Sequence, residues 1–298
     1  MGLLVKKLNK SFNNVKVVNN VSFEMKKPSA LGLVGVNGAG KTTTIRMIID
    51  ILKKESGSVI WNGEEFDRDK IKIGYLPEER GIYPKTRIKD QLIYFAKLKG
   101  LNDEEANNSL NVWSKKFKVE KYLEKTPEEL SKGNQQKVQL LTVFMHNPDL
   151  IILDEPLSGL DPINAELIKN LLNELIKKGK YIIITSHQMN IIEDFCSHIV
   201  MLKEGKVIMS GNIEELKDKL QKNILIINGE KKLMNFLKEK YDAKKLSNSI
   251  CEIELKDKKE SSKILEEIVA CKYEIEKFEI RKPTLREIFI DKAGDNNE

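Results

Sequence analysis

The chain has 298 residues, of which 40% are hydrophobic and 32% are charged, and its mean hydropathy is -0.39. This composition excludes fibrous, collagen-like and wholly disordered proteins, and the length suits one large domain with a smaller companion. No apolar run reaches the roughly 20 residues of a membrane helix, and the opening segment has no uninterrupted apolar stretch of the secretory type. We therefore expect a soluble globular protein that reaches any membrane through a partner.

The net charge of +6 and the three cysteines decide little about function. Lysines alternate with acidic and polar residues in stretches such as 256–263 (KDKKESSK), as on a solvated face, so no nucleic-acid partner is expected. Cys196, Cys251 and Cys271 are scattered and form no CxxC pair, which argues against both a disulfide framework and a zinc site. A reducing cytoplasm is the compartment that fits this pattern.

Two domains are predicted, over residues 1–215 and 216–298. In the first, strand and helix signals alternate from the apolar strand 30–34 onwards, which indicates an α/β fold with helices against a largely parallel sheet. Between about 83 and 147 only helix-period patterns occur, so we predict an inserted helical subdomain there. The second domain shows the order strand, helix, two short strands, helix, strand. That order predicts a small ferredoxin-like α+β domain.

The sharpest motif is the segment 35–42 (GVNGAGKT), which satisfies GxxxxGK[ST] and separates an apolar strand from a helix. In such a loop the backbone N–H groups converge on phosphate oxygens at the positive end of the helix, and the lysine neutralises the β- and γ-phosphates. A chance match occurs on the order of once in a hundred chains of this length, so a glycine-rich turn with an incidental lysine is the alternative. The nucleotide-binding residues predicted from this loop are Gly35, Val36, Asn37, Gly38, Ala39, Gly40, Lys41, Thr42 and Thr43.

A second apolar strand, 150–153 (LIIL), ends in the two acids Asp154 and Glu155. Four consecutive apolar residues fit a strand that is buried on both faces of a parallel sheet, and open α/β sheets bind ligands at the carboxyl ends of their strands. There Asp154 and the hydroxyl of Thr42 are expected to bind Mg²⁺, Glu155 to polarise the attacking water, and Lys41 to stabilise the transferred charge. The alternative, a strand ending in a solvated Asp-Glu turn, is weakened by the phosphate loop in the same domain.

These motifs resemble those of the ATP-binding subunits of ABC transporters. Residues 130–136 (LSKGNQQ) stand where that family carries its LSGGQ signature, with Lys132 in place of the first glycine and Asn134 in place of the glutamine. The resemblance implies that Ser131, Gly133 and Asn134 grip the γ-phosphate of a nucleotide held by a second subunit. In isolation, this segment would be read as an ordinary serine N-cap.

The resemblance covers residues 1 to about 215 and assigns four further roles. His187 occupies the place of the switch histidine, which contacts the γ-phosphate and orients the water, although a lone histidine is more often structural. Asp161 lies in the loop that passes between opposed subunits, and Phe12 matches the aromatic residue that stacks on adenine, where a lone phenylalanine would by default be core. Glu78 replaces the usual glutamine. Its carboxylate can bind Mg²⁺ but adds negative charge beside ATP, which leaves open how this loop couples ATP hydrolysis to transport.

The resemblance implies an ATPase whose two copies, or this chain and a paralogue, close head to tail around ATP and reopen on hydrolysis to drive a separate membrane permease. Glu78, the variant signature and the segment 282–289 (KPTLREIF) are similar to the bacterial sodium-export and drug-export type. We therefore expect an exporter subunit, cytoplasmic and peripheral on the inner face of the cell membrane. The alternatives are a soluble ABC ATPase of DNA repair or translation, disfavoured by a single motif set without heptads, and a non-hydrolysing regulatory subunit, disfavoured by the intact catalytic residues.

Overall fold

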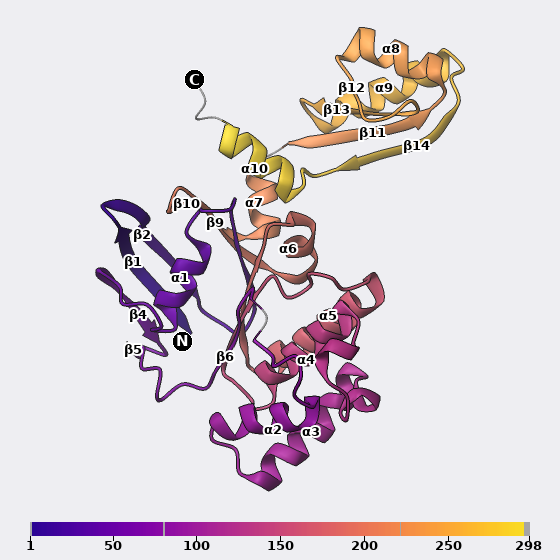
Figure 1. Cartoon of the computed structure of the whole chain (residues 1–298). Helices are drawn as coiled ribbons and strands as arrows, with labels where there is room; N and C mark the ends of the chain where they lie inside the picture. Colours follow the sequence, from indigo (N-terminus) through magenta and orange to yellow (C-terminus); the bar gives the residue numbers. More distant parts are fainter. Residues whose placement is uncertain (1, 80, 221, 295–298) are drawn as a thin grey trace. The chain divides into compact units, whose positions relative to one another are not determined.

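The structure, a computed structural model, describes residues 2–79, 81–220 and 222–294 (Figure 1). The chain divides into two compact units, residues 1–211 and 212–298, and each has its own hydrophobic core. The first unit contains every nucleotide motif predicted above. Among the described residues, no helix is both long and apolar enough to span a bilayer.

The first unit is built on a six-stranded sheet with the order β10-β9-β3-β8-β7-β6. Its central strands pair in parallel: β3 with β8 and β9, and β7 with β6 and β8. Every residue of β3, β7 and β8 is buried, as expected for strands covered on both faces, so the largely parallel α/β sheet predicted from the sequence is confirmed. The strands are β3 (Ala30–Val34), β6 (Ile73–Leu76), β7 (Leu150–Asp154), β8 (Tyr181–Ser186), β9 (His198–Lys203) and β10 (Lys206–Asn212), and the helices are α1 (Lys41–Ile48), α5 (Pro162–Lys177) and α6 (Met189–Phe195).

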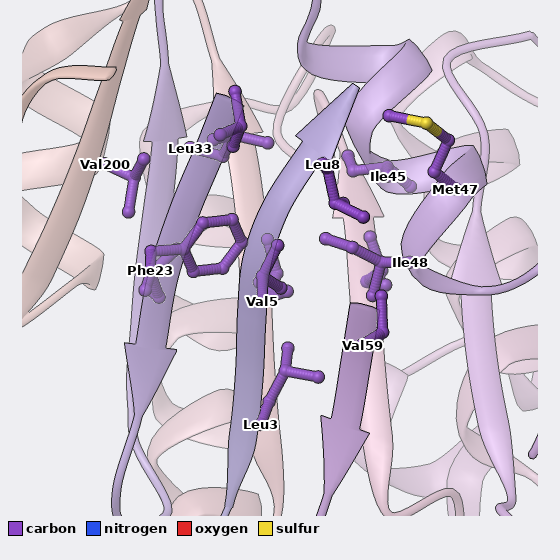
Figure 2. Packing of buried hydrophobic residues seen from close by; sticks show 14 of the residues in the cluster. Leu3, Val5, Leu8, Phe23, Leu33, Ile45, Met47, Ile48, Val59 and Val200 are labelled. Carbon is purple, nitrogen blue, oxygen red and sulfur yellow. The ribbon is translucent and has the colours of Figure 1, made fainter. Parts of the chain in front are cut away.

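A second, antiparallel sheet with the order β2-β1-β4-β5 completes the first unit and was not among the sequence predictions. Its inner side chains, such as Leu3, Val5 and Leu8, belong to one buried cluster with Ile45 and Ile48 of α1 (Figure 2). This cluster fixes the helix that follows the phosphate loop, because the apolar face of α1 is buried in it. The strands are β1 (Leu3–Phe12), β2 (Val15–Met25), β4 (Ser56–Trp61) and β5 (Glu64–Glu65).

The predicted helical subdomain is a group of helices inserted between β6 and β7. An aromatic stack forms its centre, in which the ring of Trp113 lies 5.3 Å from that of Phe144 and 6.0 Å from that of Phe117. A capping box between Asn102 and Glu105 sets the start of its longest helix. The helices are α2 (Ile88–Leu98), α3 (Asp103–Phe117) and α4 (Lys132–Phe144), with 3-10 turns η1 (Glu120–Tyr122) and η2 (Pro127–Glu129) between the last two.

The second unit contains a four-stranded sheet with the order β12-β13-β11-β14, and α8 and α9 cover one of its faces (Figure 1). This is the ferredoxin-like α+β arrangement predicted from the sequence. Leu225 and Ile227 of β11 alternate toward the helices, where Leu233, Leu237 and Ile264 bury them. The elements are α7 (Ile213–Lys219), β11 (Asn223–Gly229), α8 (Lys231–Tyr241), β12 (Lys244–Lys245), β13 (Ile250–Leu255), α9 (Lys258–Ala270), β14 (Ile275–Arg281) and α10 (Leu285–Gly294).

The segment 282–289, noted in the sequence for its family resemblance, begins the last helix of this unit. Thr284 and Glu287 form a reciprocal cap, because the backbone N–H of Thr284 donates to Glu287 and the N–H of Glu287 donates to the Thr284 hydroxyl. The two terminal guanidinium nitrogens of Arg281 each donate to one carboxylate oxygen of Glu287 at 2.7 Å. These bonds tie the start of α10 to the end of β14.

Candidate nucleotide-binding site

The phosphate loop runs from the carboxyl end of β3 to the first turn of α1. Gly40 adopts φ of +94°, and a Cβ on it would lie 2.6 Å from the carbonyl oxygen of Val17, so only glycine fits there. Gly205, in the turn between β9 and β10, also lies close to this carbonyl, because a Cβ on it would be 2.4 Å from the same oxygen. The N–H of Gly205 donates to the carbonyl of Ala39 at 3.2 Å, and the carbonyl of Gly205 accepts a hydrogen bond from the N–H of Asn19 at 2.8 Å. The loop is thus clamped between two distant segments of the chain.

Lys41 lies half-buried at the centre of the loop. Its Nζ donates to the carbonyl oxygens of Gly35 and Val36, at 2.8 and 3.2 Å. Burial lowers the pKa of Lys41, while the negative charges of Glu155, Asp154 and Glu78 oppose that shift. These three acids are far from Lys41 in the sequence, and the charge of each acts on this one lysine in the folded chain.

Asp154 is the last residue of β7 and is only 3% exposed. The hydroxyl of Thr42 donates to its Oδ2 at 3.4 Å, and the hydroxyl of Thr185, directly opposite on β8, donates to its Oδ1. Within the described residues, no cluster of three or more His, Cys, Asp or Glu side chains is arranged to hold a metal. One carboxylate with one hydroxyl does fit Mg²⁺, which in nucleotide sites keeps several waters and takes its other ligands from the substrate phosphates.

Glu155 follows β7 directly, with φ of +50° and a side chain that is 14% exposed. Its Oε1 accepts a hydrogen bond from the backbone N–H of His187 at 2.7 Å, and the Nδ1 of the same histidine also lies 2.7 Å from Oε1. Its Oε2 accepts a hydrogen bond from the hydroxyl of Ser186 at 3.1 Å. The structure thus joins Glu155 to the predicted switch histidine. Ser186 and Thr185 were not singled out as site residues from the sequence.

The signature residues form a separate group at the beginning of α4. Ser131 caps this helix by accepting from the N–H of Asn134 at 3.4 Å, as the simpler N-cap interpretation predicted. A Cβ on Gly133 would lie 3.2 Å from the carbonyl of Gly159, so this turn packs on the loop that carries Asp161. The amide of Asn134 donates to the Tyr122 hydroxyl at 3.2 Å, a hydrogen bond within the same subunit.

Two predicted site residues lie on the surface. Asp161 caps α5 by accepting from the N–H of Asn164 at 2.9 Å, and hydrogen bonds from Asn164 lower its pKa. Phe12 ends β1 and is 44% exposed, which argues against a core role, and the Nζ of Lys10 lies 5.4 Å from the centre of its ring. Both side chains are accessible to a ligand or a second subunit.

A cavity of about 270 Å³ lies between the sheet and the helical subdomain. Of the described residues that line it, Gln139 and His146 are both 4% exposed, and their Nε2 and Nδ1 atoms respectively have no hydrogen-bond partner. The Nε2 of His146 lies 3.0 Å from the carbonyl of Ile73, and burial lowers the pKa of this histidine to about 4. Arg68 and Lys99 also line the cavity, and burial first and the charge of Arg68 second lower the pKa of Lys99.

A phosphate loop at a helix N-terminus, beside a strand that ends in Asp154 and Glu155, defines a P-loop nucleoside triphosphatase. Residues 18–158 match the family model for ABC transporters, and residues 211–293 match that for the C-terminal domain of DrrA1-3-like ATP-binding proteins. The ABC transporter ATP-binding protein YhaQ of Bacillus subtilis, uncharacterized, is 40% identical over 296 residues, which cover 98% of both chains. The chain belongs to the family of ABC transporter ATP-binding proteins.

Other similarities agree with this assignment. An uncharacterized ABC transporter ATP-binding protein of Alkalihalophilus pseudofirmus is 41% identical over 88% of this chain and 98% of its own. A solved structure of the ATP-binding subunit of an ABC transporter superposes with a TM-score of 0.68 and 30% identity, over 74% of this chain and 94% of that one. NatA of Bacillus subtilis is 34% identical over 68% of this chain and 84% of its own, and EcsA of the same organism is also 34% identical. The similarity therefore does not single out the NatA type.

Proposed function

We propose that this chain is the ATP-hydrolysing subunit of an ABC transporter and that it drives a separate membrane permease in the direction of export. The observation that carries the proposal is the convergence of Lys41, Asp154, Glu155 and His187 at the carboxyl ends of β3, β7 and β8. A phosphate-binding lysine beside a carboxylate that can accept a proton from water is the arrangement required for phosphoryl transfer to water.

Each residue of the site has a role in this proposal. The loop from Gly35 to Thr43 binds the phosphates through its backbone, and Lys41 neutralises the charge on the transferred phosphoryl group. Glu155 takes the proton of the attacking water, and His187, bonded to Glu155, contacts the γ-phosphate. Phe12 stacks on the adenine, which its exposed ring permits.

Thr42, Asp154 and Glu78 are the residues that would hold Mg²⁺. Bound there, the ion would neutralise the β- and γ-phosphates. The negative charge of Glu78 raises the pKa of Lys41, which supports a place for this carboxylate near the phosphate loop. Thr185 supports these proposed ligands by donating to Oδ1 of Asp154. The other oxygen of that carboxylate, Oδ2, accepts from Thr42.

The proposed working form is a head-to-tail dimer, either of two copies or of this chain with a paralogue. In it, Ser131, Gly133, Asn134 and Asp161 of one subunit would close on the nucleotide held by the other. The signature group supports this arrangement because it lies at the N-terminal end of α4, whose backbone N–H groups favour an anion. Lys132 at the first position of that helix adds a positive charge to the same surface.

The proposed permease contact is the cavity between the sheet and the helical subdomain, so the subunit would work at the cytoplasmic face of the membrane. Pro77 and Gly81, which flank Glu78 in its loop, form part of the wall, so a partner seated there would act on that loop. Ile51 and Leu98 also line the cavity and are 50% and 64% exposed, which gives the site an apolar rim.

A role in DNA repair or translation is the alternative, and no feature of the described residues favours it. The comparisons identify transporter subunits instead, and residues 211–293 match a domain found in such subunits. ATP turnover alone would not distinguish the two roles. The permease contact therefore needs its own test.

The catalytic assignment is tested with Glu155→Gln. This change keeps the shape of the side chain but removes the group that accepts the proton, so we expect ATP binding to survive and turnover to fall roughly 10²- to 10⁴-fold. Sizing chromatography with Mg-ATP should show a stable dimer. Lys41→Ala is the control, because it should lose nucleotide binding as well. A Glu155→Gln variant that turns over ATP at the wild-type rate would remove Glu155 from its role as base.

The permease contact is tested with the double variant Arg68→Glu, Lys99→Glu. Two neighbouring cations beside an apolar cavity favour a partner that carries carboxylates, so reversal of both charges should repel it. We expect ATP turnover of the isolated subunit to persist and co-purification with the proposed permease to be lost. Lys115→Glu, an exposed position on α3, is the matched control. Co-purification that survives the double reversal would refute this contact.

A further inference from the structure

Ser186 ends β8, beside the phosphate loop. The register places it next to Val34, the last residue of β3, and it is only 1% exposed. Its Oγ accepts a hydrogen bond from the backbone N–H of Gln188 at 3.0 Å and donates one to Oε2 of Glu155 at 3.1 Å. A hydroxyl has a single proton. Because the lone pair of Ser186 faces a donor, its proton is directed at the Glu155 carboxylate.

The two oxygens of the Glu155 carboxylate have different surroundings. An ionised carboxylate only accepts hydrogen bonds, and each oxygen has about two acceptor positions. Oε1 accepts from the backbone N–H of His187 and, in the tautomer that carries the proton on Nδ1, from the imidazole ring of the same residue, so that both positions are used. Oε2 is bonded to the Ser186 hydroxyl and keeps one acceptor position.

We propose that Ser186 is a positioning residue for catalysis, and that it holds Glu155 so that Oε2 is the atom that accepts the proton of the attacking water. The inference rests on the proposed function. In the step, the water oxygen forms a bond to the γ-phosphorus, one water proton passes to Oε2, and the bond from the γ-phosphorus to the bridging oxygen breaks, with its electron pair leaving on ADP. Ser186 forms and breaks no bond in this step.

The need for such a residue follows from the geometry of Glu155. Its φ of +50° lies in the left-handed region, which is unfavourable for a residue with a side chain, so contacts around the residue must hold it in place. Without the Ser186 hydroxyl, the carboxylate would be held through Oε1 alone and would be free to turn about that point. A small misplacement of a catalytic group costs a large factor in rate.

The test measures kcat and KM for ATP, with Mg²⁺ present, in Ser186→Ala and Ser186→Thr of the full chain. We expect Ser186→Ala to lower kcat about 10- to 100-fold, as loss of a supporting hydrogen bond does, with KM for ATP unchanged. Ser186→Thr keeps the hydroxyl and should restore most of the kcat. Ser186→Cys, nearly the size of serine but a weaker donor, gives a second measurement if the methyl group of threonine does not fit the buried position. Ser197→Ala, an exposed serine bonded to His198, is the control and should match the wild type.

A double variant separates positioning from general damage. If Ser186 acts only through Glu155, Ser186→Ala should cause no further loss in a Glu155→Gln background. Additive losses, a raised KM, or wild-type kcat in Ser186→Ala would each overturn the inference. Wild-type turnover in Glu155→Gln alone would instead overturn the assignment of Glu155 as base, so the two failures are distinguishable.

Discussion

At the scale of single residues, Glu287 gives the second unit a dependence on pH. Hydrogen bonds from Arg281, followed by those from Thr284, lower its pKa from 4.5 to about 2. A carboxylate with a lowered pKa in the folded state stabilises that state above its unfolded pKa, and the stabilisation is lost as the pH falls through the folded value. The contribution of Glu287 should therefore be complete above about pH 4.5 and disappear toward pH 2.

We expect Glu287→Gln to destabilise the second unit by about 1–3 kcal/mol at neutral pH, because a charge-assisted pair with Arg281 is lost. The variant should also lose part of the stability change between pH 4.5 and 2. Amide hydrogen exchange in β14 and α10, measured across this range, is the readout. Glu279→Gln is the matched control on the same strand, since its exposed pair with Lys277 contributes little. Equal effects of the two changes would contradict the prediction.

The motif residues could be predicted because backbone chemistry restricts them strongly. Gly40 and Lys41 stand at fixed positions of the GxxxxGK[ST] sequence pattern, and few structures other than a phosphate loop require this pattern. Ser186 and Thr185 could not be assigned in the same way, because a hydroxyl residue at the end of a strand has many ordinary uses. The only signal was their place: two hydroxyl residues end an otherwise apolar strand, immediately before His187.

At the scale of elements, the helices and parallel strands were predictable and the antiparallel sheet was not. The run 150–153 has no polar interruption, which is typical of a strand buried on both faces. In β1, by contrast, Lys7 takes φ of +47° and the pairing with β2 shifts register at three places. The stretches 3–9 and 20–25 read as strands from the sequence, and the structure contains both. Bulges of this kind obscure which residues pair, so the antiparallel sheet that the strands form could not be predicted. The short helix α7 was missed as well, because seven residues carry too little periodicity.

The division into two units leads to a prediction about the second one. All residues of the proposed catalytic site lie before Asn212, where β10 ends. A chain truncated after Asn212 should therefore keep the wild-type affinity for ATP, measured by fluorescence titration with a labelled nucleotide. We expect the loss of the second unit to change regulation of the ATPase or the stability of its complex with the proposed permease. A truncated chain that retains its native circular dichroism but loses ATP binding would contradict this separation of roles.

At the scale of the whole molecule, the question is whether the signature surface acts on its own subunit or on another. Ser131 is exposed at the beginning of α4, and its hydroxyl caps that helix. Ser131→Arg would place a bulky cation on the surface that is proposed to meet the opposite nucleotide. We expect ATP binding by the monomer to survive, while dimerisation and cooperative hydrolysis are lost.

A mixture of variants sharpens this test. In a dimer of Ser131→Arg with Lys41→Ala, both lesions fall on one composite site and the other site stays whole. Some ATP turnover should therefore return, relative to either variant alone, if one intact site suffices. If Ser131→Arg instead abolishes ATP binding by a folded monomer, Ser131 belongs to the pocket of its own subunit and the head-to-tail arrangement is wrong.

The clamp around the phosphate loop has a consequence for natural variation in this chain. Gly205 belongs to no nucleotide motif and lies in the turn of what looks like an ordinary hairpin. It nevertheless packs closely on the carbonyl of Val17, as Gly40 does, and its N–H donates a hydrogen bond to the carbonyl of Ala39 in the loop. A side chain at Gly205 would displace β2 and the loop together, because its Cβ would overlap the backbone of Val17. In a catalogue of inherited or selected variants, changes at Gly205 should therefore be grouped with lesions of the phosphate loop, and not with the tolerated changes of surface turns.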